Sequence, residues 1–359
     1  MNLSSDFKHD APVDKRKSGS YEWWYFDGAD NTGDWHYVII FYEGCPFSPE
    51  YNKKWEDREE TKAAEHPAIS ISLYHKGAPV FYCMSEYNEK DATFKKVNEN
   101  EIKIRVGENK AHLKLEDDML NHTIQISERL PSGDELSGTI RFQSKLLSSL
   151  FKQSGKDVSH SWNLTQPRAG TKVQLFLKEA GKDAREISFM GTGYHDHNTG
   201  AEPMKNEFRD WYWGRFHFKD STLVYYLMPL ENGYQFRGWL IDVEGNLLEE
   251  IDGGSLNNSN TNLFNLKCAN KINLSSKNYS ITIDQTQTLD SGPFYYRFKS
   301  MAELKKGSII SDKAVGISEY IYPKRIHHKI YWPLVKMRYH YVGSPHWVQK
   351  SAFFYRWTW

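Results

Sequence analysis

Apolar and polar residues alternate along most of this chain, which is the pattern of β-strands with one buried face. Glycine-containing dipeptides that favour tight turns separate these segments. Helical periodicity is confined to a charged piece near Trp55–Ala64 and a turn or two around Leu146–Phe151. We therefore predict an all-β protein. The clearest strands are Trp35–Tyr42, Ala68–Tyr74, Glu101–Val106, Thr123–Ser127 and Lys172–Leu177, and the turns are Lys76-Gly77, Ser132-Gly133, Asn232-Gly233, Glu244-Gly245 and Gly253-Gly254.

A faint repeat relates the two halves of the chain. Glu22-Trp23-Trp24-Tyr25 resembles Asp210-Trp211-Tyr212-Trp213, 188 residues later. Ile69–Tyr82 matches Arg237–Glu250 at a shorter offset, since the first copy has a longer loop. Each copy is predicted to be an antiparallel meander that curls into a barrel or half barrel, a shape that can hold one small apolar ligand. We expect a disordered tail over residues 1–17 and domains over 18–182 and 183–359.

Composition narrows the classes of function. The 359 residues contain 46 Lys and Arg against 46 Asp and Glu, so no basic surface argues for nucleic acid. Three cysteines give neither a disulfide framework nor a zinc pattern and are expected to be buried apolar residues. No secretion signal or long apolar run is visible, which predicts a cytoplasmic protein. Aromatic residues make up 15% of the chain, which suits an apolar small-molecule partner. The cysteines are Cys45, Cys83 and Cys268.

The densest chemistry lies in the segment from Gly191 to Asn198. If this segment is a strand, Tyr194 and Asp196 face one way and the two neighbouring histidines face the other. Upstream, His160 and Trp162 have the same spacing and also share a face. These residues predict a pocket with an acid, a base and aromatic walls.

Several sequence blocks resemble those of the carotenoid 1,2-hydratase (hydroxyneurosporene synthase) family. This family is part of a wider group of two-domain lipocalin-like proteins that also includes a phytoalexin hydratase and fungal cyclases of the Diels–Alderase type. The resemblance implies two lipocalin-like antiparallel β-barrel or half-barrel domains packed together. It covers the chain from Tyr21 onward, but Thr199 stands where related sequences usually have Trp, so it does not fix the substrate. The blocks are Tyr21–Gly28, Gly191–Asn198, Trp213–Arg215, Gly292–Phe298 and Ser318–Pro323.

The resemblance also implies catalytic residues. Activity in the hydratases depends on a His-x-Trp pair and a Tyr-x-Asp pair, which fall here on His160 with Trp162 and on Tyr194 with Asp196. The implied reaction is hydration of a C=C bond in a carotenoid or other isoprenoid, giving a tertiary alcohol without a cofactor. Asp196 would protonate the alkene, because burial raises the pKa of a carboxyl group. Trp162 and Tyr194 would face the carbocation, and His160 would hold the attacking water and accept its proton.

Other residues of these blocks are candidates for substrate binding, namely Trp213, Trp24, His195 and Arg215. We expect no metal ligand, although His160, His195 and His197 together would form an alternative three-histidine zinc site. The tryptophan clusters also fit simple core packing, and the two histidines fit structural hydrogen bonding. Asp196 could instead cap a turn or pair with Arg215 or His197, and a positive partner would lower its pKa.

The segment Pro323–Tyr341 combines the strongest local positive charge with aromatic residues. It predicts either peripheral contact with an anionic membrane surface or a half-buried strand. Three functions stay open on the sequence: the hydratase, a cyclase or pericyclase of a polyene on the same scaffold, and a carrier that binds a lipid or pigment without chemistry. The hydratase is the preferred prediction.

Overall fold

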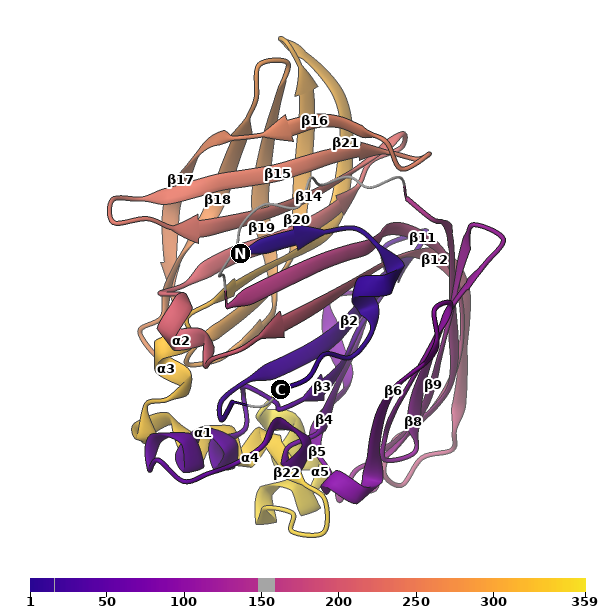
Figure 1. Ribbon diagram of the computed structural model, residues 1–359, viewed down its shortest axis with the longest axis vertical. Coiled ribbons are helices and arrows are strands. Elements are labelled where there is room, and N and C mark those ends of the chain that lie inside the picture. Colours follow the sequence, from indigo (N-terminus) through magenta and orange to yellow (C-terminus); the bar gives the residue numbers. More distant parts are fainter. Residues whose placement is uncertain (16, 148–158) are drawn as a thin grey trace. The chain divides into compact units, whose positions relative to one another are not determined.

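The computed structural model describes residues 1–15, 17–147 and 159–359. Nearly all of their regular structure is β, so the all-β prediction is confirmed (Figure 1). The described residues form two compact units. The first comprises Met1–Pro203 and Lys329–Trp359, and the second comprises Met204–His328.

The first unit is built on one curled sheet, drawn from indigo to magenta in Figure 1 apart from its yellow edge strand β22. Its strands follow the order β22-β5-β4-β3-β2-β12-β11-β10-β9-β8-β7-β6, and β1 pairs with β11. Neighbours are antiparallel except for β1 with β11 and β22 with β5. The strands are β1 (Asn2–Ser4), β2 (Tyr21–Asp30), β3 (Trp35–Glu43), β4 (Ala68–His75), β5 (Ala78–Glu86), β6 (Ala92–Asn98), β7 (Glu101–Val106), β8 (Asn109–Glu116), β9 (Met119–Arg129), β10 (Glu135–Lys145), β11 (His160–Lys178), β12 (Arg185–Gly200) and β22 (Tyr339–Tyr341).

The second unit is an antiparallel sheet with the order β16-β15-β14-β13-β21-β20-β19-β18-β17. Gly253-Gly254, predicted to be a turn, instead begins strand β17, where Gly253 pairs with Ser275. The strands are β13 (Trp211–His217), β14 (Ser221–Pro229), β15 (Tyr234–Asp242), β16 (Leu247–Ile251), β17 (Gly253–Thr261), β18 (Lys267–Ser275), β19 (Tyr279–Ser291), β20 (Tyr295–Lys306) and β21 (Ile309–Ile321).

The two sheets share one topology. Each contains a meander of four consecutive strands, β2 to β5 and β13 to β16, whose first strand also pairs with the last long strand of its unit, β12 or β21. This correspondence supports the internal repeat inferred from the aromatic motifs. The boundary after residue 182 stays a prediction about independently folding domains.

The helices are short and lie elsewhere than predicted. Helix α1 spans Pro49–Glu56 and is capped at its N-terminus by Ser48. It overlaps the predicted helix Trp55–Ala64 only at Trp55 and Glu56. The segment Pro323–Tyr341 is mostly helical, so the alternative of a half-buried strand is wrong for all but its last three residues. The predicted turn at Leu146–Phe151 lies largely outside the described residues. The other α-helices are α2 (Met204–Glu207), α3 (Pro323–Ile326), α4 (Trp332–Arg338) and α5 (Ala352–Trp357).

The N-terminal segment is part of the first unit, so the prediction of a disordered tail is wrong for residues 2–10. Strand β1 pairs with β11, and a 3₁₀ helix follows at Phe7–Asp10. Phe7 is buried in the hydrophobic core. Asp10 is fully buried and accepts hydrogen bonds from Asn163 and Thr165. The segment is ordered because it contributes both an apolar and a polar anchor to the sheet.

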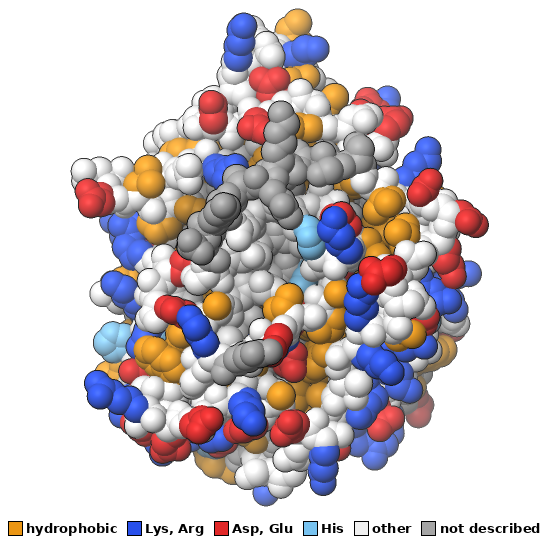
Figure 2. All heavy atoms as spheres, in the orientation of Figure 1, with side chains coloured by type: hydrophobic (Ala, Val, Ile, Leu, Met, Phe, Trp, Pro, Cys, Tyr) orange, Lys and Arg blue, Asp and Glu red, His pale blue; other side chains and the backbone are white. Residues whose placement is uncertain are grey.

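One face of the first sheet carries the core of its unit. Trp24 and Phe26 on β2 belong to this core, whereas Trp23, Tyr25 and Asp27 alternate onto the opposite face. The three cysteines are buried free thiols, as predicted. On the face drawn in Figure 2, positive and negative side chains are interspersed, in keeping with the balanced charge of the chain.

Close approach of strands requires glycine at the start of the Gly191–Asn198 segment. A Cβ atom on Gly191 would lie 1.9 Å from the carbonyl oxygen of Ala29 on β2. On Gly170 of β11, a Cβ atom would meet only the oxygen of Gln143, at 3.8 Å. The two glycines therefore differ in how much space a methyl group would find.

We predict that Gly191→Ala destabilises the protein by about 1–3 kcal/mol or more, because strand β2 must shift to admit the methyl group. The matched variant Gly170→Ala should change stability far less. Urea unfolding followed by circular dichroism measures both. Equal stabilities for the two variants would contradict the close packing of β2 on β12.

Candidate active site

Strand β12 joins the two predicted residue pairs on a single sheet face. Its neighbours are β2 and β11, and the register places Asp196 opposite Tyr25 on β2 and Leu164 on β11. Tyr194 lies opposite Asp27 in the same register. Directly paired residues of antiparallel strands share a face. This face is turned away from the core of the first unit.

The Asp196 carboxyl group is the centre of a hydrogen-bonded cluster. Its Oδ2 atom accepts hydrogen bonds from the indole Nε1 of Trp162 and the hydroxyl of Tyr194, each at 2.7 Å. Its Oδ1 atom accepts one from the amide of Asn198 at 2.9 Å. Asp196 is 4% exposed, and Trp162 and Tyr194 are fully buried. Three donors therefore fix the carboxyl group in an environment with almost no solvent.

Burial raises the pKa of Asp196 to about 7, because the charged carboxylate loses its hydration. Hydrogen bonds from Tyr194 and Trp162 oppose this shift, as does the charge of His195, whereas the negative charge of Asp27 adds to it. A substantial fraction of Asp196 is consequently protonated near neutral pH. An ordinary aspartate would be almost wholly ionised there.

Asp27 is a second buried carboxylate on the same face, and it is not among the residues predicted from the sequence. Its side chain is fully buried, and its Oδ2 atom accepts a hydrogen bond from the hydroxyl of Tyr25 at 3.2 Å. The rings of Tyr25 and Tyr194 meet edge to face at 6.0 Å. Asp27 disfavours ionisation of Asp196, because two negative charges in a dry environment repel each other.

His160 lies two side-chain positions along β11 from Leu164, the residue opposite Asp196. Burial lowers its pKa to about 3, and a hydrogen bond with Asn198 only partly offsets this. Its Nδ1 atom lies 3.0 Å from the hydroxyl of Tyr21. Asn198 contacts both His160 and Asp196, so one amide links the two titratable groups. His160 is a neutral imidazole at neutral pH.

The other face of β12 carries a different set of polar residues. His195 lies 3.3 Å from Asp10, and His197 lies 2.7 Å from Glu22. Burial alone would lower the pKa of His197, but the hydrogen bond and charge of Glu22 raise it above its usual value. Trp24 stacks on His197 with ring centroids 4.7 Å apart. Both histidines make structural contacts next to the core.

The structure thus brings together Asp196, Tyr194 and Trp162, with His160 further along the same face. Strand alternation places Trp24 and His195 on the opposite face, away from the Asp196 carboxyl group. The alternative zinc site is not formed, because His160 does not share a face with His195 and His197. Trp213 and Arg215 lie on β13 of the second unit, and their role in substrate binding stays a prediction.

Asp27 and Asn198 lie within the blocks Tyr21–Gly28 and Gly191–Asn198, which carry the family resemblance. Alternation along Tyr21–Gly28 could have placed Asp27 on one face with Trp23 and Tyr25. No sequence pattern gives the pairing of β2 with β12, however, since about 160 residues separate the two strands. That pairing is what brings the second carboxylate to Asp196.

Comparisons with known proteins give consistent results. The model of the carotenoid hydratase CrtC family matches residues 38–342. A protein of Chlorobaculum tepidum named hydroxyneurosporene dehydrogenase is 27% identical over 343 residues, which cover 90% of this chain and 88% of that protein. An acyclic carotenoid 1,2-hydratase of Rubrivivax gelatinosus is 26% identical over 218 residues, 60% of this chain and 48% of that protein. The chain thus matches about half the length of the Rubrivivax relative.

A solved structure shares the fold. The crystal structure of CghA with Sch210972 superposes with a TM-score of 0.61 over 89% of this chain and 98% of that one, at 11% sequence identity. A likeness at this identity concerns the backbone arrangement alone. It agrees with the lipocalin-like architecture that the sequence blocks implied.

The raised pKa of Asp196 predicts a pH dependence of stability. A carboxyl group with a higher pKa in the folded state contributes stability that is fully present below its unfolded pKa of about 4 and is lost as the pH rises through about 7. As the pH rises from about 4 to about 7, the wild-type protein should lose this stability while Asp196→Asn does not. The free energy of unfolding of the variant minus that of the wild type should therefore increase by a few kcal/mol over this range. Urea unfolding at several pH values measures the difference. The exposed Glu186 on the same strand supplies the control, and Glu186→Gln should show no such trend.

Proposed function

The chain belongs to the carotenoid hydratase CrtC family, and from this premise we propose that it hydrates a C=C bond of an acyclic carotenoid or related isoprenoid to give a tertiary alcohol. The observation that carries the proposal is the buried Asp196 carboxyl group, held by three donors and protonated in part near neutral pH. Addition of water to an isolated alkene begins with protonation, and this group supports that step.

The hydrogen bonds suggest which oxygen carries the transferable proton. Oδ2 accepts from both Trp162 and Tyr194, so it suits the carbonyl oxygen of the neutral acid. The proton then resides on Oδ1, whose one hydrogen-bond partner among the described residues is Asn198. Transfer from Oδ1 to the less substituted alkene carbon forms a C–H bond and leaves a tertiary carbocation. The carboxylate that remains is stabilised by the same donors on Oδ2.

The surroundings of Asp196 suit a carbocation. Tyr25 and Tyr194 are buried beside the two carboxyl groups, and the faces of such rings attract cations. Trp162 and Tyr194 direct their polar hydrogens at Asp196, so these two residues hold the acid as well as enclosing it. Asp27 adds negative charge on the same face, which favours a cation over its neutral precursor.

Water completes the reaction. Its oxygen bonds to the tertiary carbon, and the proton it releases returns to the carboxylate pair Asp196 and Asp27, which restores the acid. His160 is neutral and can accept a hydrogen bond from this water. With a pKa of about 3 it is a weak proton acceptor. We therefore propose that His160 positions the water and that the carboxylates take up its proton.

Replacing the acid tests the proposal directly. We predict that Asp196→Asn lowers the rate of hydration of an acyclic carotenoid such as lycopene by about 10²–10⁴-fold, because the amide cannot protonate the alkene. Assays in deuterated water, read by mass spectrometry, should show one carbon-bound deuterium and one new hydroxyl group in the wild-type product. The variant Glu186→Gln changes an exposed acid on the same strand and should retain full activity.

The same assay separates the alternative functions. An isomer of the substrate without added water would indicate a cyclase, and an unchanged bound polyene would indicate a carrier. Full turnover by Asp196→Asn would refute the assignment of the acid. Tyr194→Phe tests the role of the hydrogen bond to Asp196. Loss of this bond should raise the pKa of Asp196 and shift the alkaline limb of the pH–rate profile to higher pH.

We further propose that the first unit collects its apolar substrate at an anionic membrane surface through its C-terminal segment. The part of the first unit from Lys329 to Trp359 contains five Lys and Arg residues and no acidic residue. Four aromatic side chains near the C-terminus are exposed, with exposed fractions from 46% to 79%. Exposed aromatic rings among cations are typical of interfacial binding. Among the described residues, no helix is long and apolar enough to cross a bilayer. The aromatic residues are Trp347, Phe353, Phe354 and Trp357.

Vesicle co-sedimentation tests this contact. We predict that the wild-type protein binds vesicles containing phosphatidylserine and binds phosphatidylcholine vesicles less, with binding to the former weakened by salt. The double variant Phe353→Ser and Trp357→Ser should lose most of the binding. Leu263→Ser, at a fully exposed leucine of the second unit, is the control. Equal binding by the two mutants would contradict the assignment of the surface.

A further inference from the structure

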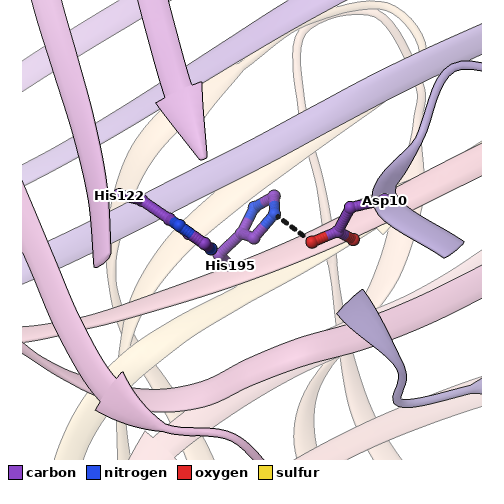
Figure 3. A group of neighbouring side chains, drawn as sticks. All are labelled: Asp10, His122 and His195. Carbon is purple, nitrogen blue, oxygen red and sulfur yellow. Dashed lines mark hydrogen bonds and ion pairs between the residues drawn. The ribbon is translucent and has the colours of Figure 1, made fainter. Parts of the chain in front are cut away.

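Three buried residues meet on the core face of the first sheet, on the side of β12 opposite to Asp196. Asp10 ends the N-terminal 3₁₀ helix, His122 lies on β9, and His195 lies on β12 (Figure 3). Each offers one ligand atom, and these atoms all lie within 4.8 Å of one another. The exposed fraction is at most 1% for each residue. Two imidazoles and a carboxylate form a donor set that binds divalent transition metals.

The contact between His195 and Asp10 is longer than an ordinary hydrogen bond between charged groups. Nε2 of His195 lies 3.3 Å from Oδ2 of Asp10. The neighbouring pair His197 and Glu22 is separated by 2.7 Å. With metal–ligand bonds of about 2.0–2.1 Å, two ligands of a tetrahedral zinc ion lie about 3.3 Å apart. The observed separation suits a shared metal ion.

Hydrogen bonds orient both residues as metal ligands require. Nδ1 of His195 lies 2.9 Å from the carbonyl oxygen of Tyr25, which can only accept a hydrogen bond. Nδ1 therefore carries a proton, and in the neutral ring the lone pair of Nε2 points at Oδ2 of Asp10. Asn163 and Thr165 both donate to Oδ1 of Asp10, which leaves Oδ2 for this contact. Two lone pairs that face each other require a proton or a cation between them.

His122 distinguishes between these two possibilities. Neither of its ring nitrogens has a hydrogen-bond partner among the described residues. Its ring lies 5.3 Å from that of His195, edge to face. A proton shared by His195 and Asp10 would leave this buried imidazole unsatisfied, which is unfavourable. A metal ion bound to all three residues gives His122 a partner as well.

Gln166 is a candidate for a fourth ligand. Gln166 pairs with His195 in the β11–β12 register, and its amide nitrogen donates to the carbonyl oxygen of Leu120, two residues from His122. Its Oε1 atom is buried without a partner within the described part of the chain. This oxygen or a water molecule would complete a tetrahedral set.

We propose that Asp10, His122 and His195 bind one divalent metal ion of the zinc class. The ion would tie the N-terminal segment to strands β9 and β12, which are distant from it in sequence. Because Asp10, His122 and His195 lie on the core face, the site is separate from the Asp196 cluster and has a structural role. Its presence can therefore be tested without an activity assay.

Metal binding to the untagged full-length chain tests the site. After loading with Zn²⁺ and dialysis against metal-free buffer, elemental analysis should find one zinc ion per chain. Loading with Co²⁺ instead should produce the visible d–d absorption of a four-coordinate ion. A chelator should lower the Tm of the wild-type protein, and added Zn²⁺ should restore it. A chain that retains no metal after loading would overturn the proposal.

Two variants locate the site. His122→Leu should lose the bound metal and have a lower Tm than wild type in Zn²⁺. If no metal binds there, the same change removes a buried histidine that lacks a hydrogen-bond partner among the described residues, and the Tm should rise. A higher Tm would therefore overturn the proposal. Asp10→Asn keeps an oxygen for Asn163 and Thr165 but removes the carboxylate, and it should also lose the metal. His112→Leu, at a half-buried histidine on β8 paired with Glu101, should retain it.

Discussion

Removal of water from one carboxyl group is the constraint on which the proposed chemistry depends. Asp196 is almost completely buried, and the loss of hydration raises its pKa from 3.8 to about 7. Hydrogen bonds from Trp162 and Tyr194 limit this rise, because they also stabilise the carboxylate. The balance keeps the group able both to hold a proton and to release it. A carboxyl group with a much higher or lower pKa would do only one of these.

Alternation along a single strand separates two kinds of polar cluster. On one face of β12, Tyr194, Asp196 and Asn198 form the cluster to which we assign the reaction. On the other face, His195 and His197 contact the buried acids Asp10 and Glu22. Because successive side chains of a strand point to opposite faces, the two clusters can use residues of the same five-residue stretch without contacting each other. The glycines before Tyr194 let the neighbouring strand approach closely enough to contribute Asp27.

Most of the fold was predictable, because period-two alternation and turn dipeptides are local signals. The pairs His160 with Trp162 and Tyr194 with Asp196 could be placed on faces for the same reason. Asp27 could not be linked to Asp196, nor Asp10 and His122 to His195, since these partners lie far apart in the sequence and meet only through strand pairing. The N-terminal segment looked disordered because it is polar, yet Phe7 and Asp10 anchor it. Short C-terminal helices gave too few turns to show a period.

Infrared difference spectroscopy tests the central claim most directly. Spectra of the wild-type protein and of Asp196→Asn, each recorded slightly below neutral pH, differ by the bands of the single carboxyl group at position 196. A buried, protonated Asp196 should give a carbonyl stretching band of a neutral carboxylic acid, which weakens as the pH rises through about 7. Carboxylate bands alone at every pH down to about 5 would show an ordinary, ionised aspartate, and the proposed acid would then be contradicted.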